Sequence, residues 1–592
     1  MRTFLLSLAG AFVAMMLFFI LGFFMLFGLI ASIASAKPPH PASIVLTLDL
    51  NESFVDQAPT SGLAAFSGTP GFIDLLTKLK DAETDSSVKG LYIRGGSWAV
   101  GTSRSEELRQ AIQSFRDSGK FVVAHSQGMF SSSGPSLYHS ISAADEIWMQ
   151  PGTEFIINGV TFEAEFYKGL FDMIGLTPEI YAFYEYKNAP NAYSETSLTE
   201  PHREALQALA DSIWSTALEA ISEDREIALP ALRALLERGP MTAEQAMEAG
   251  LVDSLGWPEE VEEATRERAG RNTEMIRLAQ YNAPPERGRS RAPVIAVIGG
   301  QGMIVPGGGG SSSPFSSPPE FASDVIARAI LDAADDDDVR AIVFRVDSPG
   351  GVPNAADQIW RAVERAKEKG KPVVVSMGSA AASGGYYVSM GANAILANEG
   401  TITGSIGIFG GKFAIEGTLN KIGISFDTVT TGGEYASAWG VSEFTDAQER
   451  DVRAILKRGY DRFVTLAAEG RGKTFEEMDR LARGRVWTGR DAVGIGLIDA
   501  TGTFMDAVEK AKELGGIDPD VKPRLAFYPV RKSGFEALEN LFGVSAEAAR
   551  AAALVGAIAG DRRTEALLEQ LAVAEAVNSG QTIAVGPRLR ER

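Results

Sequence analysis

The chain is organised around residues 371–410, KPVVVSMGSAAASGGYYVSMGANAILANEGTITGSIGIFG. The stretch opens with an apolar, β-branched run at 373–375, which predicts a buried strand. Small residues follow, and then Ser383-Gly384-Gly385. A serine between a strand end and a helix start lies where backbone N–H groups point outward, which suits a nucleophile beside an oxyanion hole. Because small residues also serve close packing, a tight turn without chemistry is the alternative.

The composition limits the class of protein. The chain has 592 residues, a formal net charge of −20, no cysteine and four histidines. This length predicts two or more domains, and a hydrophobic content of 45% is enough for sizeable cores. The acidic balance argues against nucleic acid as a partner. The absence of cysteine excludes a cysteine nucleophile, disulfides and thiolate metal sites, and we expect no cofactor and no metal.

The N-terminal segment predicts a membrane anchor. Residues 4–36 carry no charge, and this length exceeds the roughly 20 residues that a helix needs to span a bilayer. Arg2 and the amino terminus precede it, so the start is expected in the cytoplasm and the remainder on the exported side. Ala34-Ser35-Ala36 resembles a cleavage site, which makes removal of the segment the alternative. We therefore expect an anchor at 1–36 that contacts lipid through residues 4–36.

After the anchor the chain repeats itself. Three pairs of segments match in the same order with nearly constant offsets of 251, 250 and 246 residues: 88–94 with 339–345, 131–140 with 381–390, and 242–254 with 488–500. A constant offset in one order indicates a duplicated domain. We expect a first copy at 37–285, a second copy at 286–529 and a helical tail at 530–592.

Each copy alternates short apolar runs with helical patterns, which predicts an α/β fold with mostly parallel strands. In the second copy the expected strands are 294–298, 341–346, 373–375, 394–396 and 425–429, and the expected helices include 324–334 and 446–467. The polar segment 284–289 is expected to link the copies. The Gly- and Ser-rich segment 307–319 is expected as a flexible loop inside the second copy.

The histidines limit the choice of general base. They are His40, His125, His139 and His202, so the second copy has none. A Ser-His-Asp triad would need His125 or His139 with the serines at 131–133, where Pro135 removes a backbone N–H near the oxyanion hole. A lysine is the other candidate base, and it must be buried to be neutral.

Lys187 fits that requirement best. It follows the apolar run 180–183 and lies among several tyrosines, although a snorkelling surface lysine is the alternative. At an offset of 250, Lys187 corresponds to Ser437, so the second copy lacks this lysine. Ser383-Gly384-Gly385 corresponds to Ser133-Gly134-Pro135. Each copy therefore keeps half of a site.

Five motifs carry a resemblance to a known family: YKNA at 186–189, FRVDSPGG at 344–351, SAAASGGYY at 379–387, TGSIGIFGG at 403–411 and VWTGRDA at 486–492. With them the sequence resembles the signal peptide peptidases of the SppA type (protease IV), in the long duplicated bacterial form, from the anchor to about Ile517. The resemblance implies an N-terminal transmembrane helix followed by two tandem copies of a Clp-protease/crotonase-like domain.

The resemblance also implies a Ser-Lys dyad divided between the copies. Ser383 matches the nucleophile, Lys187 the general base and Ser405 the serine that supports the lysine. Asn188 departs from the commoner YKSA pattern. For the oxyanion hole, the N–H of Gly384 is one candidate donor, and the turn at Gly350-Gly351 offers another because no Cβ blocks approach.

The function implied is that of a membrane-anchored serine endopeptidase that digests cleaved signal peptides and other short apolar peptides. The resemblance places its catalytic part on the periplasmic side of a bacterial inner membrane and predicts a ring-like homo-oligomer, most simply a tetramer. Two alternatives are a crotonase-type acyl-thioester enzyme, which would share the fold, and a catalytically inactive membrane scaffold.

Overall fold

The computed structural model describes most of both copies: residues 41–52, 54–57, 70–96, 100–130, 134–270, 272–284, 292–308, 321–529 and 584–585. The predicted anchor at 1–36 lies outside the described residues, as do nearly all of the predicted linker, most of the glycine-rich loop and most of the tail. Within the described ranges, no helix combines the length and the apolar character needed to cross a bilayer.

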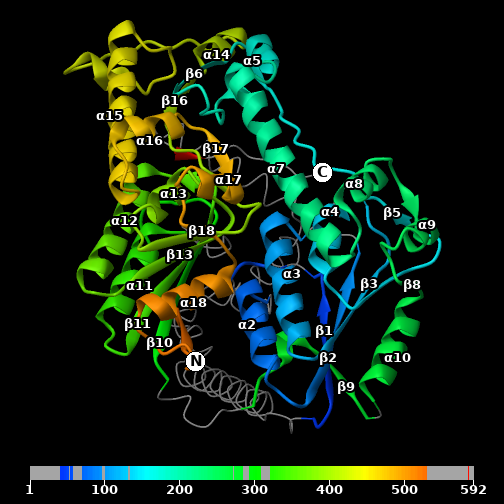
Figure 1. Cartoon of the computed structure of the whole chain (residues 1–592). Coiled ribbons are helices and arrows are strands. Elements are labelled where there is room, and N and C mark those ends of the chain that lie inside the picture. The colour runs from blue at the N-terminus through cyan, green and yellow to red at the C-terminus, as the bar shows by residue number, and fades with distance from the viewer. Residues whose placement is uncertain are drawn as a thin grey trace, which may run out of the picture.

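The first copy contains a six-stranded sheet in the order β8-β4-β3-β2-β1-β9, in which every neighbouring pair is parallel. Its strands are β1 (Ile44–Asp49), β2 (Val88–Gly95), β3 (Phe121–Ser126), β4 (Glu146–Met149), β8 (Ser254–Leu255) and β9 (Glu274–Arg277). Helices α2 (Phe72–Ala82), α3 (Thr102–Asp117) and α4 (Gly134–Ile141) pack on one face, and α10 (Pro258–Ala269) packs on the other (Figure 1). Burial on both faces explains the continuous apolar runs in these strands.

The second copy repeats this arrangement strand for strand. Its strands are β10 (Val294–Gln301), β11 (Val339–Ser348), β13 (Val373–Ala382), β14 (Ala394–Ala397), β18 (Ala500–Thr501) and β19 (Arg524–Tyr528), in the order β18-β14-β13-β11-β10-β19. Two further strands, β15 (Ile402–Gly404) and β17 (Val486–Thr488), extend the sheet from the end of β13. The structure thus holds two α/β sheets of one topology, as the repeated segments predict.

Helices cover both faces of the second sheet. One face packs against α11 (Ser323–Asp335), α12 (Pro353–Glu368), α13 (Gly384–Ser389) and α15 (Asp446–Gly470). The other face packs against α18 (Phe504–Leu514) and against Ile73 of α2 from the first copy. The expected helices at 324–334 and 446–467 are α11 and α15. The expected strand at 425–429 is wrong: this run is irregular and exposed, with Val429 97% exposed, because no strand pairs with it within the described ranges.

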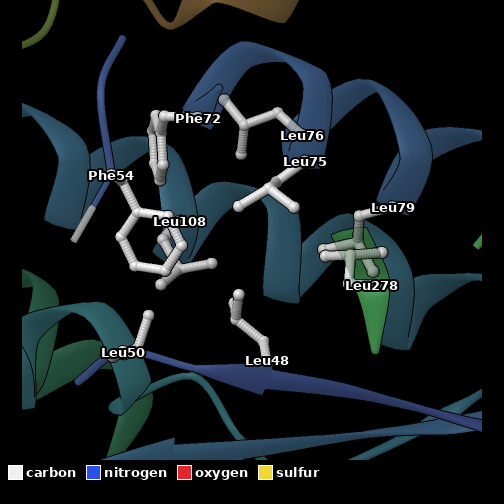
Figure 2. A pocket seen from close by; sticks show the side chains of 9 residues that line it. All are labelled: Leu48, Leu50, Phe54, Phe72, Leu75, Leu76, Leu79, Leu108 and Leu278. Atoms are coloured by element: carbon white, nitrogen blue, oxygen red, sulfur yellow. The ribbon is translucent and has the colours of Figure 1, made fainter. Parts of the chain in front are cut away.

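Apolar side chains fill the interior of the first copy between β1 and its helices. A cavity of about 10 Å³ lies there. Its lining side chains, shown in Figure 2, are Leu48, Leu50, Phe54, Phe72, Leu75, Leu76, Leu79, Leu108 and Leu278. A space of this size holds at most one water, and the carbon lining offers a water no hydrogen bonds. The cavity is therefore a small packing defect and has no room for a ligand.

Two elements of the first copy reach the second copy. Strand β6 (Thr177–Phe183) pairs antiparallel with β16 (Ile408–Ala414) along its full length. Helix α7 (Glu200–Asp224) follows β6 and packs beside β17 of the second copy (Figure 1). The turn between β6 and α7 carries Lys187, so this pairing brings the lysine to the second sheet.

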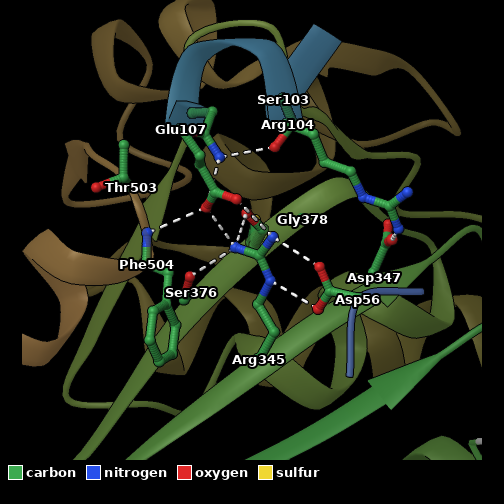
Figure 3. A network of polar contacts seen from close by, with 12 residues as sticks. Asp56, Ser103, Arg104, Glu107, Arg345, Asp347, Ser376, Gly378, Thr503 and Phe504 are labelled. Atoms are coloured by element: carbon green, nitrogen blue, oxygen red, sulfur yellow. Dashed lines mark hydrogen bonds and ion pairs between the residues drawn. The ribbon is translucent and has the colours of Figure 1, made fainter. Parts of the chain in front are cut away.

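A buried ionic network also joins the two copies (Figure 3). Arg345 on β11 donates to Asp56 at 3.0 Å from both Nε and Nη2, and to Glu107 on α3 at 2.7 Å and 3.0 Å. Ser376 on β13 accepts a further bond at 3.0 Å. The guanidinium and both carboxylates are buried. Strands β11 and β13 end at the site described next. Through this network, Asp56 and Glu107 of the first copy bind the strands of the second copy that carry the site.

Candidate active site

Ser383 stands at the junction of β13 and α13. Its backbone has φ 53° and ψ −112°, a conformation that costs free energy for a residue with a Cβ. Hydrogen bonds hold it there: its N–H donates to Gly404 O at 2.8 Å, and its carbonyl accepts from Tyr387 N at 2.8 Å. Strain of this kind, maintained by the surrounding structure, is typical of functional positions.

Lys187 meets Ser383 across the boundary between the copies. Its Nζ lies 2.8 Å from Ser383 Oγ and 3.0 Å from both the carbonyl oxygen and the Oγ of Ser405. A neutral amine has two N–H groups and one lone pair. The two N–H groups can satisfy the two oxygens of Ser405, which directs the lone pair at the hydroxyl hydrogen of Ser383. The three sequence-predicted residues therefore lie together in one hydrogen-bonded group.

The surroundings of Lys187 favour its neutral form. The side chain is 2% exposed, and it forms no ion pair with a carboxylate within the described ranges. Burial lowers the pKa of Lys187 well below its usual value. Glu185, two residues before the lysine, accepts a hydrogen bond from Arg483 Nε at 2.8 Å, and this bond lowers the pKa of the Glu185 carboxyl. The acid nearest to Lys187 in the sequence is thus paired with another residue.

Ser405 owes its position to an unusual backbone. It lies between β15 and β16 with φ 50°, and its N–H donates to Arg485 O at 2.7 Å. This conformation lets both its carbonyl and its hydroxyl face Nζ of Lys187. Asn188, the departure from the family pattern, is buried beside the lysine and accepts a bond from Asn191 Nδ2 at 3.3 Å.

The predicted oxyanion glycines lie side by side. A Cβ on Gly384 would stand 2.9 Å from Gly351 N, and a Cβ on Gly351 would stand 2.1 Å from Ile304 O, so the backbone approach requires glycine at both positions. Gly350 has φ 124°, and its N–H donates to Ser348 Oγ at 3.1 Å. Of the three glycines, Gly350 therefore has its amide already engaged.

The two glycines of the turn form a short strand, β12 (Gly350–Gly351), which pairs antiparallel with β20 (Ala584–Val585). An extended segment of this chain thus already lies along the edge beside Ser383. The side chain of Ser383 is fully buried in this arrangement.

The first-copy histidines have other partners. His139 Nδ1 lies 3.2 Å from Ser105 Oγ, and His125 Nε2 lies 3.1 Å from Gly256 O. Burial lowers the pKa of both, that of His139 to about 4. The serines at 131–133 lie outside the described residues. In the described part of the first copy, neither His125 nor His139 is hydrogen-bonded to a serine in the way that Lys187 is bonded to Ser383: His139 contacts Ser105 within its own copy, and His125 contacts a backbone carbonyl.

Sequence reasoning missed one segment that contacts the site. Gly484 lies against the backbone of Lys187, and its flanking arginines pack on the tyrosines beside the lysine. The position of this segment directly before the VWTGRDA motif is the only sequence signal that points to it.

Comparisons with known proteins identify the family of the chain. A family model described as Peptidase family S49 matches residues 114–272 and 365–518. "Protease 4" of Salmonella typhi is 32% identical over 501 residues, covering 79% of this chain and 78% of that protein. "Serine protease SPPA, chloroplastic" of Arabidopsis thaliana is 30% identical over 554 residues, covering 90% and 77%. A solved membrane-bound stomatin-specific protease, 15% identical, has a TM-score of 0.26 over 40% of this chain and 97% of its own.

A buried serine at a strained strand–helix junction, hydrogen-bonded to a lysine without a counter-ion, is the geometry of a serine hydrolase. The chain belongs to peptidase family S49. It is a serine protease related to the signal peptide peptidases of the SppA (protease IV) type. This assignment favours the protease over the acyl-thioester enzyme and the inactive scaffold.

Proposed function

We propose that the protein is a membrane-anchored endopeptidase that cleaves peptides with a Ser383–Lys187 dyad, each copy supplying one member. The observation that carries this proposal is the 2.8 Å contact between Lys187 Nζ and Ser383 Oγ inside a group without a carboxylate. A lysine held neutral by burial can accept a proton near neutral pH, which an exposed lysine cannot.

The proposed reaction follows the usual order of acyl transfer. Neutral Lys187 takes the hydroxyl proton while Ser383 Oγ attacks the peptide carbonyl, and the lysine then gives this proton to the leaving amine. The resulting ester of Ser383 is attacked by a water that Lys187 deprotonates, which releases the second product. Ser405 keeps the amine of Lys187 in place throughout, through the two contacts at 3.0 Å.

The oxyanion needs donors that face the attacked carbonyl. Gly384 and Gly351 are the proposed donors, because their backbones lie against each other beside Ser383. Gly350 supports the turn through its positive φ and its bond to Ser348. The pairing of β12 with β20 supports the further proposal that a substrate binds as an extended strand along this edge.

The proposed substrates are cleaved signal peptides and other short apolar peptides near the membrane. The uncharged segment 4–36 supports an N-terminal transmembrane helix, and the positive start of the chain supports a catalytic part on the periplasmic side of an inner membrane. We also propose that each copy has the Clp-protease/crotonase-like fold that the resemblance implies, and that the protein does not bind nucleic acid.

We also propose a homo-oligomer, most simply a tetramer. Large apolar side chains are exposed on α5 (Lys168–Ile174), at the end of α14 (Glu416–Lys421) and in the irregular segment that follows α14: Met173 and Ile422 are each 69% exposed and Val429 is 97% exposed. Exposed apolar side chains of this size are typical of a protein interface. Contact with neighbouring copies would bury it.

Three variants test the dyad. Ser383→Ala and Lys187→Ala should each lower kcat/KM for a small-residue peptide by several orders of magnitude, since members of such a unit act together. Ser133→Ala, the matched change in the first copy, should keep wild-type activity. Activity of either of the first two variants near the wild-type level would refute the assignment.

A further inference from the structure

Three consecutive residues of the second copy, Arg483, Gly484 and Arg485, contact the turn that carries Lys187. The carbonyl of Arg483 accepts hydrogen bonds from Tyr184 N and Tyr186 N, both at 3.2 Å. Gly484 lies so close that a Cβ there would stand 2.4 Å from Lys187 N and 2.5 Å from Lys187 Cα. The backbone of this segment thus determines how near the lysine turn can come to the second copy.

The same segment also holds the turn that carries Ser405. Ser405 N donates to Arg485 O at 2.7 Å, and Gly484 N donates to Ile406 O at 2.9 Å. Arg483 and Gly484 both have positive φ, at 53° and 86°, and this pair of left-handed residues turns the carbonyls of Arg483 and Arg485 toward different partners. One tripeptide therefore fixes the lysine and its supporting serine relative to each other.

The arginine side chains hold the residues around the lysine. Arg483 forms an ion pair with Glu185 at 2.8 Å, and its guanidinium lies 4.6 Å from the ring centre of Tyr184. Arg485 pairs with Glu204 of α7 at 2.7 Å and lies 4.9 Å from the ring centre of Tyr186. The three residues that precede Lys187 are each held by one of these arginines.

We propose that the Arg483-Gly484-Arg485 segment of the second copy positions the Lys187 amine of the first copy for proton transfer with Ser383. This proposal rests on the proposed Ser-Lys dyad and adds the element that assembles the dyad across the two copies. The three residues act through the lysine turn: they contact residues 184–187 and 204 on the first copy and 405–406 on the second, and none of the contacts described above is with Ser383.

Loosening the segment has two consequences that can be measured. The Nζ to Oγ distance grows, and a misplacement of about 1 Å can cost on the order of 100-fold in rate. Water also reaches the amine, so the pKa of Lys187 returns toward its usual value and the activity profile moves to higher pH. Substrate contacts away from the lysine stay as they are, so KM changes less than kcat.

The test uses the full chain in detergent with four variants: Gly484→Ala, Arg485→Ala, Arg485→Lys and the control Arg490→Ala. Arg490 also belongs to the second copy and also pairs with a glutamate of α7, Glu219 at 2.6 Å, but it does not contact the lysine turn. For each variant, kcat, KM, the pH midpoint of kcat/KM and the melting temperature are measured with one fluorogenic peptide.

We expect Gly484→Ala to lose on the order of 100-fold in kcat. Arg485→Ala should lower kcat and move the pH midpoint upward, Arg485→Lys should recover part of both effects, and Arg490→Ala should match the wild type. If Gly484→Ala does not fold, the comparison of Arg485→Ala with Arg490→Ala tests the positioning proposal.

Folded Arg485→Ala protein with the wild-type kcat and pH midpoint would overturn the proposal, and so would equal effects of Arg485→Ala and Arg490→Ala. The dyad itself is tested separately by Lys187→Ala. An active Lys187→Ala protein would refute both proposals. An inactive one, together with silent changes at 484 and 485, would refute only the positioning role.

Discussion

The contribution of the buried Arg345 network to the stability of the protein can be measured by removing the arginine. In Arg345→Met the side chain keeps a similar length and apolar stem but loses its charge and its five N–H donors. Asp56 and Glu107 would then remain buried, with their partner gone. Breaking a buried pair in this way costs about 3–5 kcal/mol, because the buried carboxylates lose their main counter-ion. We expect a loss of stability of that size at pH 8.

The loss should depend on pH, with a sign that follows from Asp56. Burial raises the pKa of Asp56, but the charge and hydrogen bond of Arg345 more than offset it, so the pKa lies below its usual value. This depressed pKa contributes stability above pH 4, which is lost as the pH falls through the folded value. Without Arg345, burial raises the pKa above the unfolded value, so the variant loses stability as the pH rises. The wild type and the variant should therefore differ more at pH 8 than at pH 4.5.

Denaturant unfolding of the full chain in detergent, followed by tryptophan fluorescence at both pH values, measures the effect. Arg361→Met is the control, because Arg361 pairs with Glu368 at 2.8 Å on an exposed surface where such pairs contribute about 0–1 kcal/mol. A loss for Arg345→Met no larger than that of the control, or a loss that is greater at pH 4.5, would refute this account of the network.

Three more predictions follow from the site and its surroundings. Lys187→Met should have a higher melting temperature than the wild type in mild acid. The reason is that a lysine with a depressed folded pKa destabilises the fold increasingly as the pH falls from about 10.4 through that folded value. Melting curves at pH 5.5 and 9 show whether the difference in melting temperature is largest in acid, and equal melting temperatures would contradict the prediction. Deleting residues 581–592, which include β20, should speed the labelling of the serine by a fluorophosphonate, since the edge of β12 then becomes free; unchanged or slower labelling would show that this strand does not restrict access. Replacing Met173, Ile422 and Val429 together by serine should reduce the mass found by light scattering, whereas an unchanged mass would place the subunit contact elsewhere.

Much of the fold could be predicted from the sequence, because two physical signals were strong. Buried parallel strands appear as continuous apolar runs, and the duplication provided each run with a second example. The run at 425–429 shows the limit of this signal, since an apolar run forms a strand only where a partner strand is available. Strand β13 shows the opposite: it continues through small residues to Ala382, because β15 pairs with its end.

The pairing of β6 with β16 lay beyond prediction from local pattern. Periodicity indicates a strand but does not identify its partner, and these two strands are separated by more than 200 residues. The contact between Ser383 and Lys187 could be proposed only because each copy lacked what the other retained, and because the motifs resembled a known family. The Arg483-Gly484-Arg485 segment had no such signal, since a left-handed arginine leaves no mark on the sequence.

In the proposed mechanism, Lys187 of the first copy deprotonates Ser383 of the second copy. The most direct measurement is the second-order rate constant for fluorophosphonate labelling of Ser383 from pH 5 to 9, in the full-length wild type and in Lys187→Met. We expect the wild-type rate to be low in acid and to rise with pH along a single titration, with a midpoint well below the usual lysine pKa of about 10.4. We expect Lys187→Met to be slower by orders of magnitude at every pH. A flat wild-type profile, or a Lys187→Met protein labelled at the wild-type rate, would contradict this mechanism.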